Sequence, residues 1–319
     1  MLKKKARSPT ENSMLLHIRI AALLFLYLGV PCSAGSPALS AYVGNNPSAL
    51  LQFENWLGRP VDQIAAHTGR ASWNDWVGSI KWSVELWSPL NKPIRWTIPL
   101  FADQGNLQDA AAGKYQSYYE QAAKILANSR RSDDVIYVRT GEEFNGNWMP
   151  WSAAGHEQDF VKAYRRFVEA FRSVSNRFRF EWNANIRETR MNPADAYPGD
   201  DYVDVIGMDF YYNTKWNPTN PVAAWNEMVN GQYGLQWLED FAAAHKKPTG
   251  YPEWGVNFDG AGPYIEKAAQ WFSDHNVLYQ SVWNSNDDFP GKLTDNQYPK
   301  AAAAYIESFG ANASDHRPR

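Results

Sequence analysis

Segments with the pattern of buried β-strands recur along this chain and alternate with segments of helical periodicity. Eight strand candidates alternate with helical runs within residues 38–309. A (β/α)₈ barrel typically needs about 250 residues, so the alternation predicts one α/β domain, a single TIM barrel with its functional cleft at the C-terminal ends of the strands. The strand candidates are residues 41–43, 64–66, 94–101, 135–138, 178–182, 203–208, 249–253 and 277–283.

The helical stripes support this prediction. Phe160, Tyr164, Phe167 and Phe171 have the spacing of one buried helix face. The competing fold is a doubly wound open sheet that binds a nucleotide. No glycine-rich phosphate loop follows any of the strand candidates, so the barrel is the better prediction.

The N-terminal residues have the pattern of a secretory signal peptide. A basic stretch at residues 3–7 precedes an apolar run at 20–30, and Cys32-Ser33-Ala34 follows. The apolar run is much shorter than the roughly 20 residues of a membrane-spanning helix, so a membrane anchor is the poorer alternative. We expect cleavage after Ala34, a signal peptide at 1–34, a single domain at 35–319, and a secreted or periplasmic protein.

Cysteine content and charge narrow the possible functions. Cys32 is the only cysteine, so the predicted mature chain has no disulfides and no cysteine-ligated metal. Removal of residues 1–34 takes away five basic residues and one acidic residue, which changes the net charge from −3 to −7. A mildly acidic exported protein has no electrostatic reason to bind nucleic acid or anionic lipid. We expect a monomer without cofactor or metal that binds a neutral ligand.

Two short runs carry the chemistry. GEEFNGNW at 141–148 and GYPEWG at 250–255 place Glu143 at the end of the fourth strand candidate and Glu253 at the end of the seventh. In a barrel both side chains would face one cleft. Paired carboxylic acids are the reacting groups of most glycosidases, and retaining enzymes hold them about 5–5.5 Å apart. Their mutual repulsion raises one pKa, and a nearby cation or hydroxyl donor keeps the other low.

Aromatic residues indicate a sugar ligand, because flat apolar rings stack on the C–H faces of sugars. The chain has 15 Trp and 17 Tyr. We expect Trp56, Trp225 and Trp271, on helical segments, to lie in the core. Tryptophans outside predicted helices are expected to include several sugar-binding residues. They are Trp73, Trp76, Trp148, Trp151, Trp216 and Trp283.

The run RTGEEFNGNW at 139–148 resembles the acid/base segment of glycoside hydrolase family 26, the clan A family that includes the β-mannanases. YPGDDYVDVIGMDFY at 197–211 is similar to the sixth-strand region of that family, and the resemblance covers most of residues 38–309. It implies a TIM-barrel retaining endo-β-glycosidase. Glu143 would be the acid/base and Glu253 the nucleophile, with Tyr211 as hydrogen-bond donor to the nucleophile and Arg139 as the arginine four residues before the acid/base.

One residue departs from the family pattern. Family members usually carry a histidine immediately before the acid/base glutamate, where it helps to hold the sugar at the cleavage point, and this chain has Glu142. The departure leaves the polysaccharide open between β-mannan, β-glucan and the substrate of an outlying group within the clan. Glu142 itself is interpreted either as a hydrogen-bond partner behind the site or as a contact to the sugar.

Strand alternation predicts that Arg139, Gly141 and Glu143 share one face and that Thr140 and Glu142 share the other. Arg139 could then favour the ionised state of Glu253. The remaining substrate-binding candidates follow other strands. They are Asn183 and Asn185, which could alternatively cap a loop, Trp283, expected as the sugar platform, and His67, which could alternatively belong to the scaffold.

Two other functions remain open from the sequence. The barrel could have lost activity and serve as a sugar-binding protein, although both glutamates are present with Arg139 and Tyr211. It could instead process the cell's own exopolysaccharide as a hydrolase or transglycosylase. The sequence does not distinguish this role from the degradation of an external polysaccharide as a nutrient.

Overall fold

The computed structural model describes residues 37–131 and 133–313. The predicted signal peptide at 1–34 lies outside the described residues and stays a prediction. Among the helices that are described, none has the length and apolar character needed to cross a bilayer.

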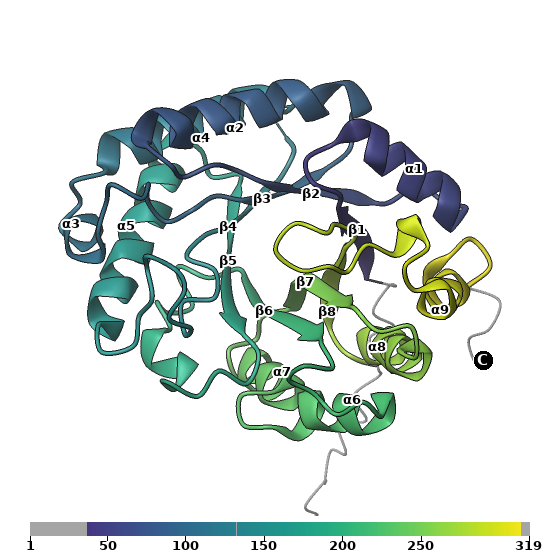
Figure 1. The fold of residues 1–319 in the computed structure, drawn as a ribbon. Helices are drawn as coiled ribbons and strands as arrows, with labels where there is room; N and C mark the ends of the chain where they lie inside the picture. Colours follow the sequence, from purple (N-terminus) through teal and green to yellow (C-terminus); the bar gives the residue numbers. More distant parts are fainter. Residues whose placement is uncertain (1–36, 132, 314–319) are drawn as a thin grey trace, which may run out of the picture. The chain divides into compact units, whose positions relative to one another are not determined.

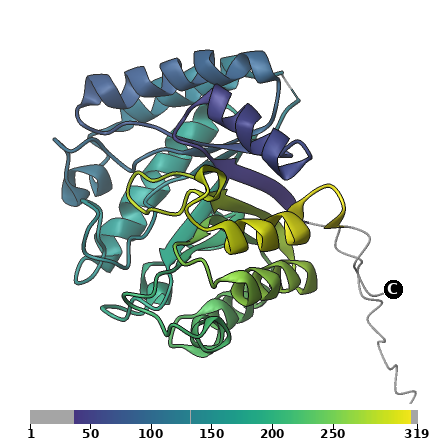
Figure 2. The same ribbon diagram turned by 45° about the vertical axis from the view of Figure 1, so that its right-hand side comes forward.

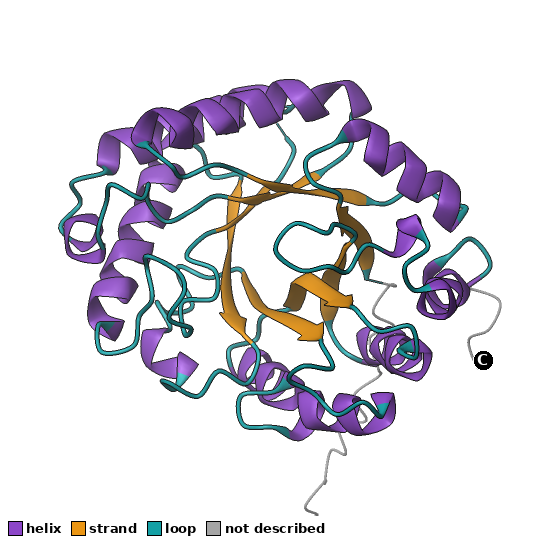
Figure 3. Cartoon of the chain, in the orientation of Figure 1, coloured by secondary structure: helices purple, strands orange, loops and turns teal. Residues whose placement is uncertain are grey.

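Eight parallel strands form a closed barrel in which neighbours in sequence are neighbours in space and β8 pairs with β1. Figure 3 shows this ring of strands surrounded by helices. The predicted TIM barrel is therefore confirmed. The strands are β1 (Ala38–Tyr42), β2 (Gln63–His67), β3 (Ile94–Thr97), β4 (Ile136–Arg139), β5 (Phe178–Asn185), β6 (Val205–Tyr212), β7 (Thr249–Val256) and β8 (Val277–Trp283).

Helices connect successive strands and cover the outside of the ring (Figure 1). The α-helices are α1 (Pro47–Leu57), α2 (Trp73–Trp87), α3 (Leu107–Ala111), α4 (Gln116–Ser129), α5 (Glu157–Val174), α6 (Pro221–Asn230), α7 (Leu235–Ala244), α8 (Gly262–Asp274) and α9 (Pro299–Phe309). Three short 3₁₀ segments are η1 (Ser88–Leu90), η2 (Pro193–Ala196) and η3 (Leu293–Asp295).

Local sequence signals explain several of these boundaries. Asn46 caps α1 by accepting a hydrogen bond from the Ala49 amide, Pro47 occupies the first turn, and Gly58 ends the helix in the left-handed region at φ 78°. The predicted stripe of α5 is fully buried against the barrel. Burial of four aromatic side chains on one face is what holds this helix in place.

The sequence prediction missed helix α2. Trp73 and Trp76 were assigned to a loop, but they begin this helix, and Trp76 is a fully buried core residue. The expectation of sugar binding is therefore wrong for Trp76. The third strand is also shorter than predicted, because β3 ends at Thr97 while 98–101 is irregular.

The segment between β8 and α9 lies over the strand ring in both ribbon views (Figures 1 and 2). Phe289 of this segment contacts Tyr211 of β6 with 4.5 Å between ring centroids, and its carbonyl accepts a hydrogen bond from the Trp283 indole. The segment therefore covers the C-terminal ends of β6 and β8. The site described next opens beside it.

Candidate active site

Glu253 lies at an irregular point of β7. The register of β7 against β6 shifts between Gly207 and Phe210, and its register against β8 shifts between Tyr251 and Trp254. Pro252, in this interval, has no amide hydrogen and cannot donate a hydrogen bond to a neighbouring strand. A bulge re-aims side chains, and here it turns Glu253 towards the barrel axis, where Arg139 and Tyr211 bind it.

Arg139, the last residue of β4, donates hydrogen bonds to two carboxylates and a hydroxyl group. One guanidinium nitrogen donates to both oxygens of Asp209 at 3.0 and 2.9 Å, and another donates to Glu253 Oε1. Its Nε donates to Thr97 Oγ1 at 3.0 Å. The side chain is buried, so the two carboxylates compensate its charge in a medium of low dielectric constant.

The second oxygen of Glu253 is also bound. The Tyr211 hydroxyl donates to Oε2 at 2.7 Å, which is the contact that the family resemblance implied. His67 Nε2 lies 3.8 Å from Oε1. Burial lowers the pKa of His67 to about 4, so the ring is neutral at neutral pH and the contact is polar rather than an ion pair.

Glu143 sits in a tight turn rather than at a strand end. Gly141 and Glu143 both have left-handed backbones, with φ of 62° and 52°. For a non-glycine residue this conformation costs about 1–2 kcal/mol, and it persists because the surroundings impose it. The Glu143 amide donates to the Asn183 carbonyl at 3.0 Å, and the Asn145 side chain both donates to and accepts from the backbone of Asn185 at 2.8 Å.

Two donors fix the carboxyl group of Glu143. The Asn185 amide donates to Oε1 at 2.7 Å, and the Trp148 indole donates to Oε2 at 2.5 Å. Trp148 is 47% exposed, so its ring lies between the carboxyl group and solvent. Sequence analysis placed Asn185 and Trp148 among the sugar-binding residues, and the structure shows that both contact Glu143.

The electrostatic environment separates the two acids. Burial, followed by the charge of Glu253, raises the pKa of Glu143 to about 7. Burial also acts to raise the pKa of Glu253, but the charge of Arg139, with the hydrogen bonds from Arg139 and Tyr211, outweighs it and leaves the pKa below its ordinary value. At neutral pH one carboxyl group therefore retains its proton much of the time while the other is ionised.

The predicted strand alternation past Arg139 is wrong. β4 ends at Arg139, and the two left-handed residues reverse the chain direction. Burial raises the pKa of Glu142, and the positive charge of Arg139 opposes this rise. Its Oε2 is buried without a hydrogen-bond partner among the described residues, and the role of Glu142 stays a prediction.

Two predicted sugar-binding residues are unavailable to substrate. Asn183 is fully buried, and its amide accepts from Arg139 at 3.2 Å and donates to Asp209 at 3.2 Å. Trp151 is fully buried as well and donates its indole hydrogen to the Glu142 carbonyl at 2.7 Å. Both residues hold the catalytic-end loops in place, which corrects their assignment as substrate ligands.

Trp283 lies next to the candidate site but is only 4% exposed. Tyr42, at the end of β1, stacks on it with 4.2 Å between ring centroids and also contacts His67 at 4.5 Å. The role of Trp283 as a sugar platform stays a prediction. The sequence analysis missed Tyr42 and Asn145; the former ends a predicted strand, and the latter belongs to the GEEFNGNW run that was already singled out.

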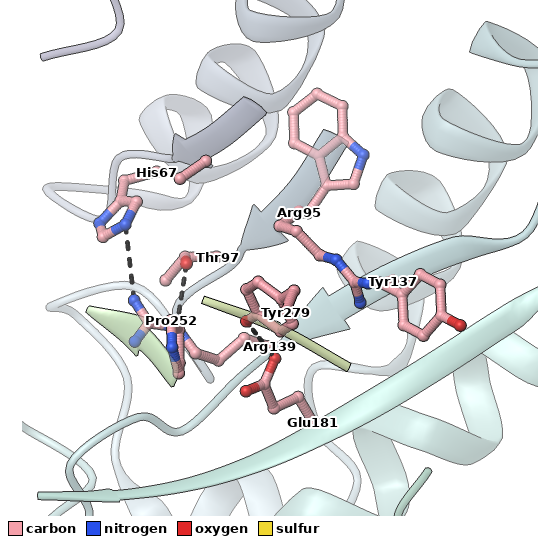
Figure 4. A pocket seen from close by; sticks show the side chains of 10 residues that line it. His67, Arg95, Thr97, Tyr137, Arg139, Glu181, Pro252 and Tyr279 are labelled. Carbon is pink, nitrogen blue, oxygen red and sulfur yellow. Dashed lines mark hydrogen bonds between the residues drawn. The ribbon is translucent and has the colours of Figure 1, made fainter. Parts of the chain in front are cut away.

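A small polar cavity lies inside the barrel, on the other side of Arg139 (Figure 4). Its lining includes Arg95, whose guanidinium lies between the rings of Tyr137 and Tyr279, 3.7 and 4.1 Å from their centroids. The Tyr279 hydroxyl donates to Glu181 Oε2 at 2.6 Å. The cavity has room for about one water molecule, so it is part of the support beneath Arg139 and not a substrate site.

Within the described ranges, no group of three or more His, Cys, Asp or Glu side chains has the arrangement of a metal site. A closed (β/α)₈ barrel that carries two partly buried carboxylic acids at its C-terminal end, one with a raised pKa and one with a lowered pKa, has the architecture of the barrel glycosidases.

Comparison with known proteins gives the family. The chain belongs to glycosyl hydrolase family 26, whose family model matches residues 63–237. This match includes β4, with the GEEFNGNW run, and β6, while Glu253 lies beyond it. The resemblance found in the sequence is thus confirmed.

Curated relatives carry different activities. The chain is 24% identical over 311 residues to Endoglucanase H of Acetivibrio thermocellus, covering 87% of this chain and 31% of that protein. It is 23% identical over 263 residues to Mannan endo-1,4-beta-mannosidase A and B of Caldalkalibacillus mannanilyticus, covering 76% of this chain and 48% of the relative. The chain thus spans 31% and 48% of the lengths of these two relatives.

Solved structures share the fold. The catalytic domain of the Bacillus sp. JAMB-750 GH26 Endo-beta-1,4-mannanase superposes with a TM-score of 0.61 over 89% of both chains, at 15% sequence identity. At this level of identity the likeness establishes the barrel alone. The substrate has to be argued from the site.

Proposed function

We propose that this chain is an exported, monomeric, retaining endo-β-glycosidase that hydrolyses a β-linked polysaccharide, a β-mannan or β-glucan, by double displacement. The observation that carries the proposal is the different environment of two carboxyl groups at one end of the barrel. Arg139 and Tyr211 bind Glu253, whose pKa is lowered, while Asn185 and Trp148 bind Glu143, whose pKa is raised. A retaining mechanism requires this starting state. Membership of family 26 supports the same reaction class.

In the first step the ionised Glu253 attacks the anomeric carbon. The new bond joins a carboxylate oxygen to that carbon while the glycosidic C–O bond breaks, and Glu143 gives its proton to the departing oxygen. Arg139 and Tyr211 each bind one oxygen of Glu253. They keep the nucleophile ionised and hold its orientation before the attack.

In the second step water releases the sugar. Glycosylation removes the negative charge of Glu253, and that charge is one of the causes that raise the pKa of Glu143. The pKa of Glu143 therefore falls in the intermediate, and the residue can now accept a proton from water. The water oxygen bonds to the anomeric carbon, the ester bond to Glu253 breaks, and the product keeps the original anomeric configuration.

Exposed aromatic residues near the cleft support binding of a chain rather than a single sugar. Trp148 borders Glu143, and Trp216, 80% exposed, lies on the segment between β6 and α6, which is at the catalytic end of the barrel. Solvent-exposed indole rings on this face can stack on successive sugars of a polymer. We therefore propose endo action.

The test is hydrolysis of a panel of β-mannans, β-glucans, xylans and bacterial exopolysaccharides, with reducing ends and product size measured together. Proton NMR of the first product gives the anomer. We expect a mixture of oligosaccharides with initial retention of configuration. Initial formation of the inverted anomer would exclude the mechanism, and binding without release of reducing ends would favour the inactive sugar-binding barrel. Transfer products from an exopolysaccharide would favour the transglycosylase.

A further inference from the structure

Trp283 is the expected sugar platform, yet other side chains cover its ring. Tyr42 stacks on the indole, with 4.2 Å between ring centroids and an interplanar angle of 28°. His67 and Tyr211 approach it edge-on at 5.9 and 6.2 Å. Its indole nitrogen donates to the Phe289 carbonyl at 3.1 Å, and the residue is only 4% exposed. A sugar could therefore stack on Trp283 only if Tyr42 moved away.

Tyr42, His67 and Glu253 form a continuous surface that solvent reaches. The Tyr42 ring lies 4.5 Å from the His67 ring, and His67 Nε2 lies 3.8 Å from Glu253 Oε1. The His67 side chain is 23% exposed and that of Glu253 is 13% exposed, while Tyr42 is also partly exposed. Figure 4 shows the His67 ring pointing towards Arg139, the cation that binds Glu253. A ligand can therefore reach all three side chains from solvent.

The backbone fixes the position of Tyr42. This residue ends β1, where it pairs with Trp283 of β8, and its carbonyl accepts a hydrogen bond from the Asn284 amide at 2.9 Å. The turn that follows is joined to β2, because the Asn45 side chain donates to the His67 carbonyl at 2.7 Å. An aromatic ring that is held in this way loses little conformational freedom when it binds a ligand. Tyr42 is therefore preorganised as a binding surface.

The nucleophile determines which sugar lies here. In the retaining mechanism the anomeric carbon bonds to an oxygen of Glu253. Oε1 lies next to His67, which contacts Tyr42. Oε2 accepts from Tyr211, which lies beside Trp283. From either oxygen the bound sugar borders the pair of Tyr42 and Trp283, and Tyr42 is the member of that pair that is partly exposed.

We propose that Tyr42 contacts the sugar bonded to Glu253 and forms the sugar-binding surface on the nucleophile side of the cleavage point, with Trp283 as its support. The proposal rests on the proposed glycosidase function and deepens it by naming a substrate-binding residue. The flat ring can stack on the C–H face of a sugar, and the hydroxyl group can donate to or accept from a sugar hydroxyl. Residues on this side bind the part of the chain that stays on the enzyme after the first step.

The first measurement is binding. Titration calorimetry gives the dissociation constants of β-linked mannose and glucose hexasaccharides for Glu143→Gln, alone and combined with Tyr42→Ala. We expect Tyr42→Ala to raise the dissociation constant about tenfold or more, as for truncation of a central aromatic contact. Tyr42→Phe keeps the ring and should retain most of the affinity. Tyr202→Ala removes a partly exposed tyrosine just before β6, at the other end of the barrel, and should leave the constant unchanged.

The second measurement is catalysis. On an aryl β-mannobioside and an aryl β-cellobioside, whose sugars all lie on the nucleophile side, kcat/KM of Tyr42→Ala should fall by a similar factor. The acidic limb of the pH profile, which Glu253 sets, should stay in place in Tyr42→Phe. A structural role that acts through His67 and Glu253 would instead move this limb without a change in the dissociation constant, and that result would overturn the contact. If Tyr42→Ala does not fold, Tyr42→Leu keeps the apolar volume without the aromatic ring and should show the same loss.

The outcomes separate this inference from the proposed function. Unchanged affinity in Tyr42→Ala, with hydrolysis by the wild type, would overturn the role of Tyr42 and leave the glycosidase intact. A loss of affinity that appears only when Trp283→Phe is added to Tyr42→Ala would also overturn it, because Tyr42 would then be a movable cover over the platform. Absence of both binding and hydrolysis in the wild type would overturn the glycosidase itself. Weaker binding in Tyr42→Ala but not in Tyr202→Ala, together with hydrolysis by the wild type, would support both.

Discussion

Glu253 and Glu143 lie at the same end of the barrel, and the protein holds them by different means. Glu253 belongs to a strand, and a buried arginine and a tyrosine bind one oxygen each. Glu143 belongs to a left-handed turn, and the neutral side chains of Asn185 and Trp148 bind its two oxygens. The cation stabilises the ionised form in the first environment, while burial favours the protonated form in the second. Two identical side chains thereby have pKa values that are shifted in opposite directions.

The largest expected effect comes from removing each acid. Glu253→Ala and Glu143→Ala should each lower activity on polysaccharide at least about a thousandfold while the barrel stays folded. An aryl glycoside whose leaving group needs no proton separates the two variants further. Glu143→Ala should retain formation of the glycosyl-enzyme on that substrate, seen as a burst of released phenol, and Glu253→Ala should not.

Glu266→Ala, on the outer face of α8, is the matched control and should keep wild-type activity. Near-normal turnover of polysaccharide by either cleft variant would contradict the assignment. Equal loss of the burst in both variants would contradict the division of tasks between the two acids.

Removing the cation should affect stability as well as activity. Arg139→Met leaves Asp209 and Glu253 buried without their counterion, and breaking a buried pair in this way costs about 3–5 kcal/mol. Urea denaturation at neutral pH measures the free energy of unfolding. The lost stability should partly return at low pH, because protonation of the two carboxyl groups removes the unpaired charges. A variant as stable as the wild type would show that Arg139 does not balance these acids.

A smaller effect is expected from the tyrosine. Tyr211→Phe removes one hydrogen bond to Glu253, so the pKa of Glu253 rises and the acidic limb of the kcat/KM profile moves to higher pH. A hydrogen bond to a charged group contributes about 1.5–3 kcal/mol, so activity should fall about 10- to 100-fold. The adjacent Tyr212→Phe is the control, because among the described residues its hydroxyl donates to the carbonyls of Pro218 and Thr219 and not to Glu253. Equal effects in both variants would argue against a specific role for Tyr211.

The smallest effect concerns the pH dependence of kcat/KM, through the pKa of Glu143 in the left-handed turn. The wild-type kcat/KM should decline as pH rises through about 7, because Glu143 must be protonated to act as an acid. Asn185 donates to the ionised form and lowers its pKa. In Asn185→Ala the pKa of Glu143 therefore rises, and the basic limb should move upward by about 0.5–1 pH unit.

Trp148→Phe removes the other donor and should shift the limb in the same direction. Asn230→Ala, whose amide bonds only within α6, should leave it unchanged. A downward shift in Asn185→Ala would mean that the group titrating on the basic limb is not Glu143.

The sequence by itself determined the barrel and the two acids. The fold prediction rests on eight strand candidates and the helices between them, so missing the single helix α2 did not change it. Glu143 and Glu253 could be found because each stands in an unusual run next to a strand. Strand period also placed Arg139 at the cleft floor, since a regular strand fixes side-chain direction.

Only the tertiary structure decided what lies around these acids. The left-handed residues Gly141 and Glu143 end the strand period, so the alternation predicted for Thr140 and Glu142 does not hold. Asn183 and Asn185 are two residues apart, yet one is buried against Arg139 and Asp209 and the other reaches Glu143. These contacts join segments that are 26 to 44 residues apart in the chain. Local periodicity carries no information about such pairs, because their geometry depends on the closure of the whole barrel.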